Sequence, residues 1–209
     1  FCARFLNKIL KGVKMQTILL LNGGKAFCES GGKLSAALQE VAKETLESLG
    51  LNVIETHIDK GYDETQEAQK ILSSDVLIWQ FPGWWMGEPW IVKEYIDKVF
   101  MAGAKTGQFL IGDGRHRDNP NKNYGTGGLL KRKKYLFSTT WNAPLNAFED
   151  KNEFFGGIGI DGVNLHLHKA HEFVGMSALL SFTCYDVVKN PKAEQYIADY
   201  RAHLRKVLG

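Results

Sequence analysis

The sequence predicts a three-layer α/β fold in which a parallel sheet of five strands lies between two layers of helices. Three observations lead to this prediction. Short aliphatic runs alternate with segments of helical periodicity along most of the chain. Most of these runs are continuously apolar, as in parallel strands that helices cover on both faces. At 209 residues, with 23% charged residues, the chain has the length and composition of one globular domain.

The first strand is expected at Thr17–Asn22, where an aliphatic run ends in Asn-Gly-Gly. A helix follows over residues 34–49, where apolar or small residues recur at three- and four-residue spacing. Ser30 is the expected N-cap of this helix, and Gly50 is its expected stop. Residues 52–58 alternate in polarity, which indicates a second strand.

The rest of the chain repeats this alternation. In order, we expect a helix over 64–72, a strand over 75–81, a helix over 89–100, a strand over 134–140, a helix over 168–174, a strand over 179–185 and a helix over 191–208. Strands that alternate with helices form βαβ units and a parallel sheet. We therefore expect a doubly wound sheet with the flavodoxin-like strand order 2-1-3-4-5. The connections 101–133 and 141–178 are longer than the fold requires, which indicates functional or interface surface.

Residues 1–14 differ from the rest of the chain. The segment FCARFLNKILKGVK is basic and weakly amphipathic, and it lacks the apolar stretch and cleavage site of a signal peptide. We expect an extension that is vector-derived or translated from upstream, or that is disordered, preceding a single domain over residues 15–209. The alternative is a native amphipathic arm that docks on a partner or a membrane surface.

Composition narrows the functional classes. The net charge of +3 is too small to indicate a nucleic-acid partner. No apolar run approaches the roughly 20 residues of a membrane-spanning helix. The three cysteines, Cys2, Cys28 and Cys184, form no CxxC pair and no disulfide framework, which is typical of a reducing cytoplasm.

Three histidines, His166, His168 and His171, lie close together in the sequence. A metal site is one interpretation, but no cysteine or carboxylate completes an obvious ligand set. We therefore expect no metal, and favour polar surface or dimer contacts. An assisting role beside a cofactor is a further alternative.

Ligands of an open parallel sheet bind outside the carboxyl ends of the strands, where the strand order reverses. Here that point lies between the first and third strands, which are followed by the loops 22–32 and 82–89. The first loop places Ser30, Gly31 and Gly32 at the start of a helix, where free N–H groups suit a phosphate. Because the loop matches neither GxGxxG nor a Walker pattern, a simple glycine turn is an equally good interpretation.

The second loop is rich in aromatic residues. Four of the five tryptophans lie between Trp79 and Trp90, and Trp84, Trp85 and Met86 follow a strand end directly. Bulky aromatic side chains in such a loop suit a flat heteroaromatic ligand. The alternative is that they fill a core or a dimer interface, and Trp79, inside a strand, is expected in the core.

Four longer strings carry a family resemblance: IWQFPGWWMGEPW (78–90), KNYGTGG (122–128), YLFSTTWNAP (135–144) and GIDGVNLHLHKAHEFVGM (159–176). Through them, residues 16–209 resemble the modulator of drug activity B group of NAD(P)H:quinone oxidoreductases, within the flavodoxin-like quinone reductase superfamily. The resemblance implies a homodimer that binds FAD, takes a hydride from NAD(P)H and passes two electrons to a small-molecule quinone. A pocket shared by donor and acceptor implies ping-pong kinetics.

The resemblance also implies which residues bind the cofactor. The pyrophosphate and ribityl chain would lie along Ser30, Gly31, Gly32, Lys33, Leu34, Ser35, Ala36 and Ala37, and the isoalloxazine between Gly83, Trp84, Trp85 and Met86 on one side and Thr140, Trp141, Asn142 and Ala143 on another, with Tyr124 approaching from the long connection. Tyr124 and Asn142 are the candidate catalytic residues, because each has a polar group that suits hydrogen bonding to the flavin or to the quinone oxygen.

Three other functions compete with this hypothesis. A flavin-bearing electron carrier would dock to redox proteins, but such carriers are usually strongly acidic. A non-catalytic scaffold or sensor would use the aromatic patch to bind a partner. An azo- or nitroreductase is a near neighbour of a quinone reductase, since flavoenzymes of this type reduce many flat acceptors.

Overall fold

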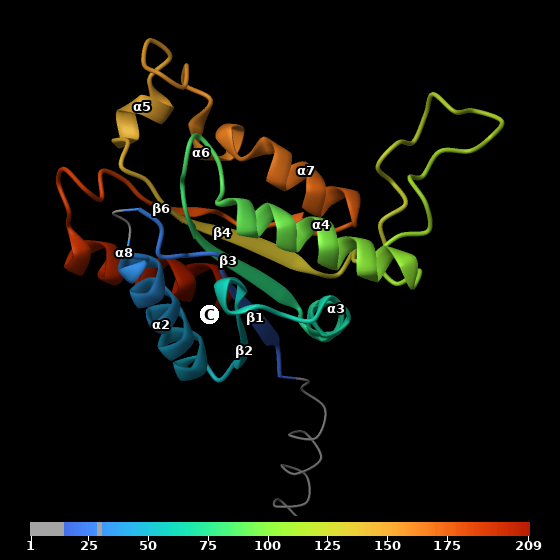
Figure 1. Ribbon diagram of the computed structural model, residues 1–209, viewed down its shortest axis with the longest axis horizontal. Helices are drawn as coiled ribbons and strands as arrows, with labels where there is room; N and C mark the ends of the chain where they lie inside the picture. The colour runs from blue at the N-terminus through green and yellow to red at the C-terminus, as the bar shows by residue number, and fades with distance from the viewer. Residues whose placement is uncertain (1–14, 29–30) are drawn as a thin grey trace, which may run out of the picture.

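The structure is a computed structural model that describes residues 15–28 and 31–209, so the expected extension at 1–14 lies outside the described residues. The elements are β1 (Thr17–Asn22), α2 (Lys33–Ser48), β2 (Asn52–His57), the 3₁₀ turn η1 (Ile58–Lys60), α3 (Glu64–Ser73), β3 (Val76–Pro82), α4 (Trp90–Lys105), β4 (Lys134–Thr140), α5 (Leu145–Glu149), α6 (Gly159–Val163), α7 (Leu165–Phe173), β5 (Ser177–Ala178), β6 (Phe182–Cys184) and α8 (Ala193–Leu208). Figure 1 shows their arrangement around the central sheet.

The sheet is parallel, and its strand order is β2-β1-β3-β4-β5, with β6 also paired to β4. This confirms the predicted order 2-1-3-4-5. In the register of the sheet, Leu19 of β1 lies beside Ile54 of β2 and Leu77 of β3. The carboxyl ends of β1, β3 and β4 therefore lie at one edge, where the loops that follow them come together.

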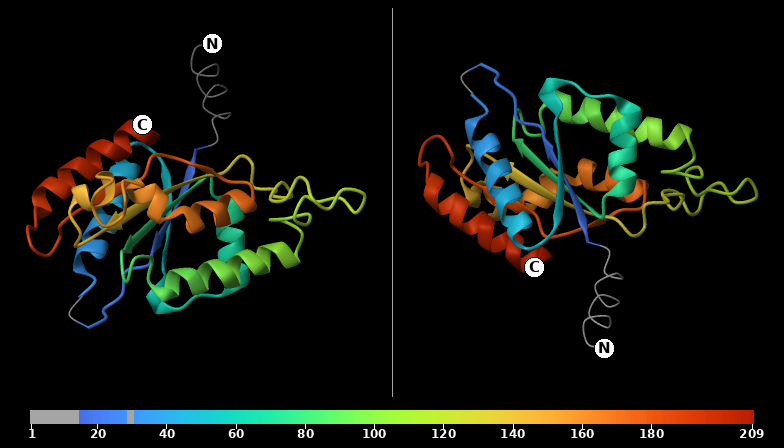
Figure 2. Two further views of the ribbon diagram at one scale, coloured as in Figure 1. Left: turned by 90° about the horizontal axis from the view of Figure 1, so that it is seen from above. Right: turned by 90° about the horizontal axis from the view of Figure 1, so that it is seen from below.

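Helices cover both faces of the sheet, as predicted. Figure 2 shows α2 and α8 on one side of it, and α3, α4 and α7 on the other. Successive strand residues point to opposite faces, so Ile18 and Leu20 pack with the α2 and α8 side chains, whereas Leu19 and Leu21 pack toward α3 and α4. The two cores hold the sheet rigid beneath its carboxyl edge.

The predicted strand over 179–185 is divided into β5 and β6. Both pair with β4, but at opposite ends of it. In the interval, the Leu180 carbonyl accepts a hydrogen bond of 2.9 Å from His203 of α8, and the Ser181 hydroxyl donates to Asp161 at 2.7 Å. These bonds to helical residues interrupt the ladder. The fifth position of the sheet is thus filled by two short strands.

The long connection between α4 and β4 forms an arm, here defined as residues 106–133. Its structure consists of turns and bends, and it projects from the body of the molecule in Figures 1 and 2. At its base, the Leu130 N–H donates to the Val174 carbonyl at 2.9 Å, which fastens the arm beside the end of α7. The other long connection, 141–178, contains α5, α6 and α7.

Candidate active-site cleft

A cleft of about 500 Å³ opens at the carboxyl edge of the sheet. Its size is within the range of ligand pockets, roughly 300–1,000 Å³. Its lining comes from four separate segments: Gly31, Gly32, Lys33, Leu34 and Ser35 at the start of α2; Pro82, Gly83 and Trp84 after β3; Thr140 and Asn142 at the end of β4; and Val187 and Val188 after β6. The two loops that the sequence singles out therefore form opposite parts of one cleft.

The α2 wall of the cleft is the open end of a helix. Gly32 occupies the N-cap position with φ +66°, and in the described part of the chain no side chain caps this end. The first intrahelical bond runs from Ala36 N–H to the Gly32 carbonyl, so the N–H groups of the first turn have no helical partner. Together with the positive end of the helix dipole, these groups favour an anion. Ser30 was the wrong choice of N-cap, since that position belongs to Gly32; Ser30 itself lies outside the described residues.

The β3 wall depends on close contact between Gly83 and the indole of Trp141. A Cβ atom on Gly83 would come within 2.3 Å of the Trp141 ring, so this position requires glycine. The Gly83 N–H donates to the Thr140 carbonyl at 2.8 Å, which ties the loop to the end of β4. Trp141 is buried and packs edge-on against Phe148. It therefore supports the cleft from below and does not line it.

After Gly83 the chain makes a tight hairpin, Trp84–Gly87. The Trp84 N–H donates to the Gly87 carbonyl at 2.7 Å, and the Gly87 N–H donates back at 3.1 Å. Between them Trp85 and Met86 have φ values of +46° and +68°. Left-handed backbone at a non-glycine residue costs roughly 1–2 kcal/mol. The side chains do not offset that cost by burial, because Trp85 is 95% exposed and Met86 51% exposed.

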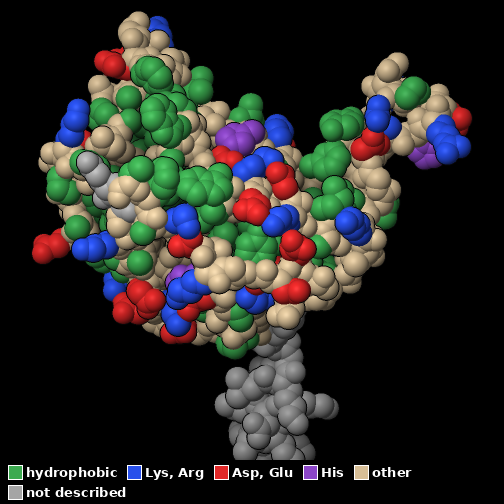
Figure 3. All heavy atoms as spheres, viewed as in Figure 1, with side chains coloured by type: hydrophobic (Ala, Val, Ile, Leu, Met, Phe, Trp, Pro, Cys, Tyr) green, Lys and Arg blue, Asp and Glu red, His purple; other side chains and the backbone are tan. Residues whose placement is uncertain are grey.

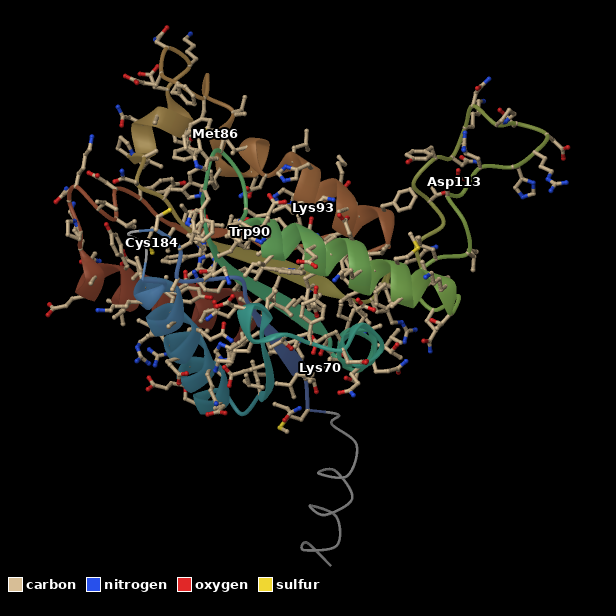
Figure 4. All side chains as sticks on the ribbon, in the orientation of Figure 1. Lys70, Met86, Trp90, Lys93, Asp113 and Cys184 are labelled. Carbon is tan, nitrogen blue, oxygen red and sulfur yellow. The ribbon has the colours of Figure 1, made fainter. Side chains whose placement is uncertain are left out.

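Trp84 is held by an aromatic cluster, which consists of Phe27, Trp84 and Trp90. The Phe27 ring lies 5.0 Å from Trp84 and 5.1 Å from Trp90, and the two indoles are 5.7 Å apart. Figure 4 marks Trp90 at the start of α4, below Met86. In Figure 3, hydrophobic side chains (green) gather on the surface around the start of α4, in the orientation of Figure 1. The cluster orients an apolar face at the rim of the cleft.

The remaining wall combines β4 with a segment that the sequence did not indicate. Asn142 is exposed on the cleft wall, while Thr140 is buried at its base. The Val187 N–H donates to the Trp141 carbonyl at 3.1 Å, which places Val187 and Val188 at the cleft. These two valines follow the last strand at the same edge of the sheet as the other loops. That shared topology is the signal by which sequence reasoning could have found them.

Several predicted cofactor residues do not line this cleft. Ala36 and Ala37 lie further along α2, Ala143 follows Asn142 but is not in the lining, and Trp85 and Met86 form the hairpin tip. Tyr124 lies on the arm, is not in the lining, and is 70% exposed. Its ring packs against Phe173 at 5.5 Å, and the Arg115 guanidinium lies 5.6 Å above it. Figure 4, which labels Asp113, shows how far the arm projects.

The expectation of surface histidines was wrong for His168 and His171, which are both buried on α7. The His171 Nδ1–H donates to the Leu167 carbonyl at 2.8 Å, and burial lowers the pKa of His171 to about 4. His168 accepts from the Tyr135 hydroxyl at 2.8 Å and donates to Asp161 at 3.2 Å. The residues that the structure describes contain no group of three or more His, Cys, Asp or Glu side chains that could hold a metal ion.

Comparison with known proteins agrees with this geometry. The sequence profile of the flavodoxin-like fold family matches residues 16–208. The chain is 54% identical over 192 residues to NADPH:quinone oxidoreductase MdaB of Haemophilus influenzae, which covers 92% of this chain and 99% of that protein. The chain belongs to the flavodoxin-like family, in its modulator of drug activity B group. The predicted family resemblance is thereby confirmed.

Two further proteins are similar to this member of the family. An uncharacterised protein of Schizosaccharomyces pombe is 50% identical over 192 residues, which are 92% of this chain and 97% of that protein. The crystal structure of general stress protein 14 from Treponema denticola, in complex with FMN, superposes with a TM-score of 0.60 at 17% identity, covering 91% of this chain and 98% of that one. At that identity the superposition shows the fold alone. In the described part of this family member, no helix is both long and apolar enough to cross a membrane.

Proposed function

We propose that this chain is an NAD(P)H:quinone oxidoreductase that binds FAD and transfers two electrons to a small-molecule quinone. The observation that carries the proposal is the cleft itself. It joins an uncapped helix N-terminus to a wall of glycine and tryptophan at the point where the strand order reverses. The name of the 54% identical relative from Haemophilus influenzae supports the same reaction.

The residues at the cleft fit a flavin. The N–H groups of the first turn of α2 match a phosphate, and Lys33 at that end supplies a positive charge. Gly83 lets the β3 loop lie directly against the supporting Trp141 ring, where a Cβ atom would clash. Trp84 adds an aromatic face at the rim. We propose that Trp85 and Met86 contact the outer side of the ring system once a ligand fills the cleft.

The cofactor, when bound, supplies the hydride chemistry, so the protein needs no nucleophile or general acid of its own. The chain's residues then bind and orient. Asn142, exposed on the cleft wall, is placed to donate an amide hydrogen bond to a carbonyl oxygen of the ring or of the quinone. Trp84 and the two valines cover apolar surface and exclude water from the reacting face.

We propose that donor and acceptor bind in turn in this one cleft. Thr140 is buried at its base, and the lining above it would face each molecule in succession. Alternating occupancy of one site gives substituted-enzyme kinetics. A steady-state series with NADPH and menadione would then give parallel double-reciprocal lines, whereas intersecting lines would contradict this step.

We further propose that Tyr124 acts in a homodimer. In its own chain Tyr124 stands on the arm, outside the cleft, with most of its ring exposed. Phe173 and Arg115 contact the ring and fix its orientation at the surface, where another molecule can reach it. An arm that projects from the body in this way suits a second copy, whose cleft Tyr124 would complete. Light scattering tests the dimer, and retained quinone turnover in Tyr124→Phe would remove the hydroxyl from the mechanism.

Activity on purified protein tests the proposed function directly. We expect the full chain, loaded with FAD, to turn over NADPH or NADH repeatedly only when a quinone such as menadione is added; without it, each flavin accepts a single hydride. A nitro compound and an azo dye, offered as alternative acceptors, should react more slowly. A loaded protein that reduces redox proteins but no quinone would favour the electron carrier instead.

A further inference from the structure

The Trp84–Gly87 hairpin needs support from outside itself. Its two central residues have left-handed backbone, and their side chains are exposed. Such conformations persist only where the surrounding structure enforces them. On the upstream side, Gly83 is fixed by its bond to Thr140 and its contact with Trp141. The downstream side must be fixed by another contact.

Glu88 provides that contact. It lies between the hairpin and α4, and its side chain is only 7% exposed. Its Oε2 accepts a hydrogen bond of 2.7 Å from Nε2 of His166, a residue of α7 that is 78 positions further along the chain. Among the hydrogen bonds of the described residues, this is the only one that joins a side chain of residues 82–89 to another element.

The burial of Glu88 makes its partner important. A carboxylate that is nearly removed from water is costly unless it is paired. The Nε2–H of His166 supplies that partner at 2.7 Å. His166 itself remains half exposed, so its own ring keeps access to water.

The helix that carries His166 is a firm anchor. Leu167 and His171 of α7 are buried against the sheet, and the Met176 N–H donates to the His171 carbonyl at 3.0 Å. Lys93, which Figure 4 labels on α4, bonds instead to Asp97 at 2.6 Å and does not compete for Glu88. Among the described residues, the Glu88–His166 pair is thus the hydrogen-bonded link between this loop and α7, in addition to the aromatic packing of Trp84 on Trp90.

We propose that Glu88 and His166 form a latch that holds the Trp84–Gly87 hairpin at the rim of the cleft, and that both are positioning residues for cofactor binding. The latch acts on the backbone of the hairpin, while the aromatic cluster holds the Trp84 ring, so neither residue of the pair has to touch the ligand. The second half of the proposal rests on the proposed flavin function, whereas the first half concerns the hairpin alone.

Hydrogen exchange and flavin titration test the two halves separately. The variants are Glu88→Ala, His166→Ala and the double variant, with Glu88→Gln as the conservative replacement that still accepts from Nε2. Lys169→Ala is the matched control, because Lys169 makes an exposed pair with Glu172 on the same helix. Exchange of the Trp84 and Gly87 amides is measured on the full chain without ligand, and the FAD dissociation constant by fluorescence.

We expect the two alanine variants to exchange these amides about tenfold faster and to bind FAD about tenfold more weakly, which is a difference of about 1.4 kcal/mol. The double variant should match either single variant, since both break one contact. Glu88→Gln should recover most of the wild-type behaviour, and Lys169→Ala should not differ from wild type. Thermal midpoints, measured alongside, should fall most in His166→Ala, because that variant leaves the nearly buried Glu88 carboxylate without its partner.

Two results would overturn the latch: unchanged exchange in Glu88→Ala, or additive changes in the double variant. Faster exchange without a loss of FAD affinity would confirm the latch and overturn the positioning role. If the wild-type chain binds no flavin, the proposed function is overturned, and the positioning role with it. The exchange data still decide whether the pair holds the hairpin.

Discussion

The two walls of the cleft meet at one edge of the sheet, but they are built in different ways. The α2 wall consists of backbone: an uncapped helix end with glycine at its N-cap position. The β3 wall consists of side chains and a strained hairpin, with Trp84 in an aromatic cluster and Gly83 flat against Trp141. The difference indicates a ligand with two unlike ends, one charged and one planar, which is the character of a flavin nucleotide.

Gly83→Ala should have the largest effect on this arrangement. The added methyl would overlap the buried Trp141 ring, so the loop or the ring must move. We expect about 2 kcal/mol less stability, as in an overpacked core, and at least a tenfold loss of FAD affinity. Urea unfolding and fluorescence titration measure the two effects. Gly87→Ala is the control, because nothing lies within 4 Å of its Cβ position, and equal losses in both variants would refute the role of the contact.

Trp84→Ala should follow, since it removes the aromatic face but leaves the backbone. Loss of a stacking partner is expected to cost about 1 kcal/mol beyond the lost area, so FAD affinity should fall roughly five- to tenfold. Trp85→Ala is the matched control at the neighbouring, exposed indole. We expect its affinity to change less than that of Trp84→Ala, and the reverse ranking would show that the ring meets the hairpin tip instead.

Gly32→Ala tests the backbone wall. Gly32 has φ +66°, so an alanine there is strained by roughly 1 kcal/mol. We expect a loss of affinity of about fivefold for FAD, and a similar loss for a phosphate-bearing fragment such as ADP. Riboflavin, which lacks the phosphate, should bind both forms equally. Gly50→Ala is the matched control, because Gly50 follows the other end of α2 with a similar φ of +76° and does not line the cleft, so this variant should bind FAD like wild type.

Mild acid should lower the free energy of unfolding through His171, which is buried in the core and lies in neither wall of the cleft. The pKa of buried His171 is about 4 in the folded chain, below its ordinary value of about 6.5. The unfolded chain therefore binds more protons between these pH values, and stability falls as the pH drops through that window. We expect about 2 kcal/mol lost by pH 5, and none above pH 7. Denaturant unfolding of His171→Leu should show a flatter pH profile; an unchanged profile would assign the loss to another group.

The sequence was informative where local pattern and topology act together. Continuous apolar runs such as that at Leu19–Leu21 specify strands buried on both faces, and helices between them impose a parallel sheet, so the strand order and both cleft loops were predictable. The division of the last strand was not predictable, because it depends on a bond that Leu180 accepts from His203 and a bond that Ser181 donates to Asp161, and both partners lie about 20 residues away in the sequence.

The finer features of the site depend on tertiary contacts. That Gly83 lies against the Trp141 ring, and that Glu88 meets His166, are matters of position across the fold. Burial of His168 and His171 was missed for a similar reason: a histidine pattern does not reveal which face of its helix meets the sheet. The predicted approach of Tyr124 to the cofactor is not seen within one chain, because the arm projects away from the body of the molecule.

The most direct test is to incubate the 209-residue chain with excess FAD, remove the unbound cofactor, and then release any flavin that remains and identify it by mass. The account predicts FAD in equimolar amount in the wild type and a clear deficit in Gly83→Ala, with Gly87→Ala at the wild-type level. Wild-type protein that retains no flavin after this treatment would contradict the central claim.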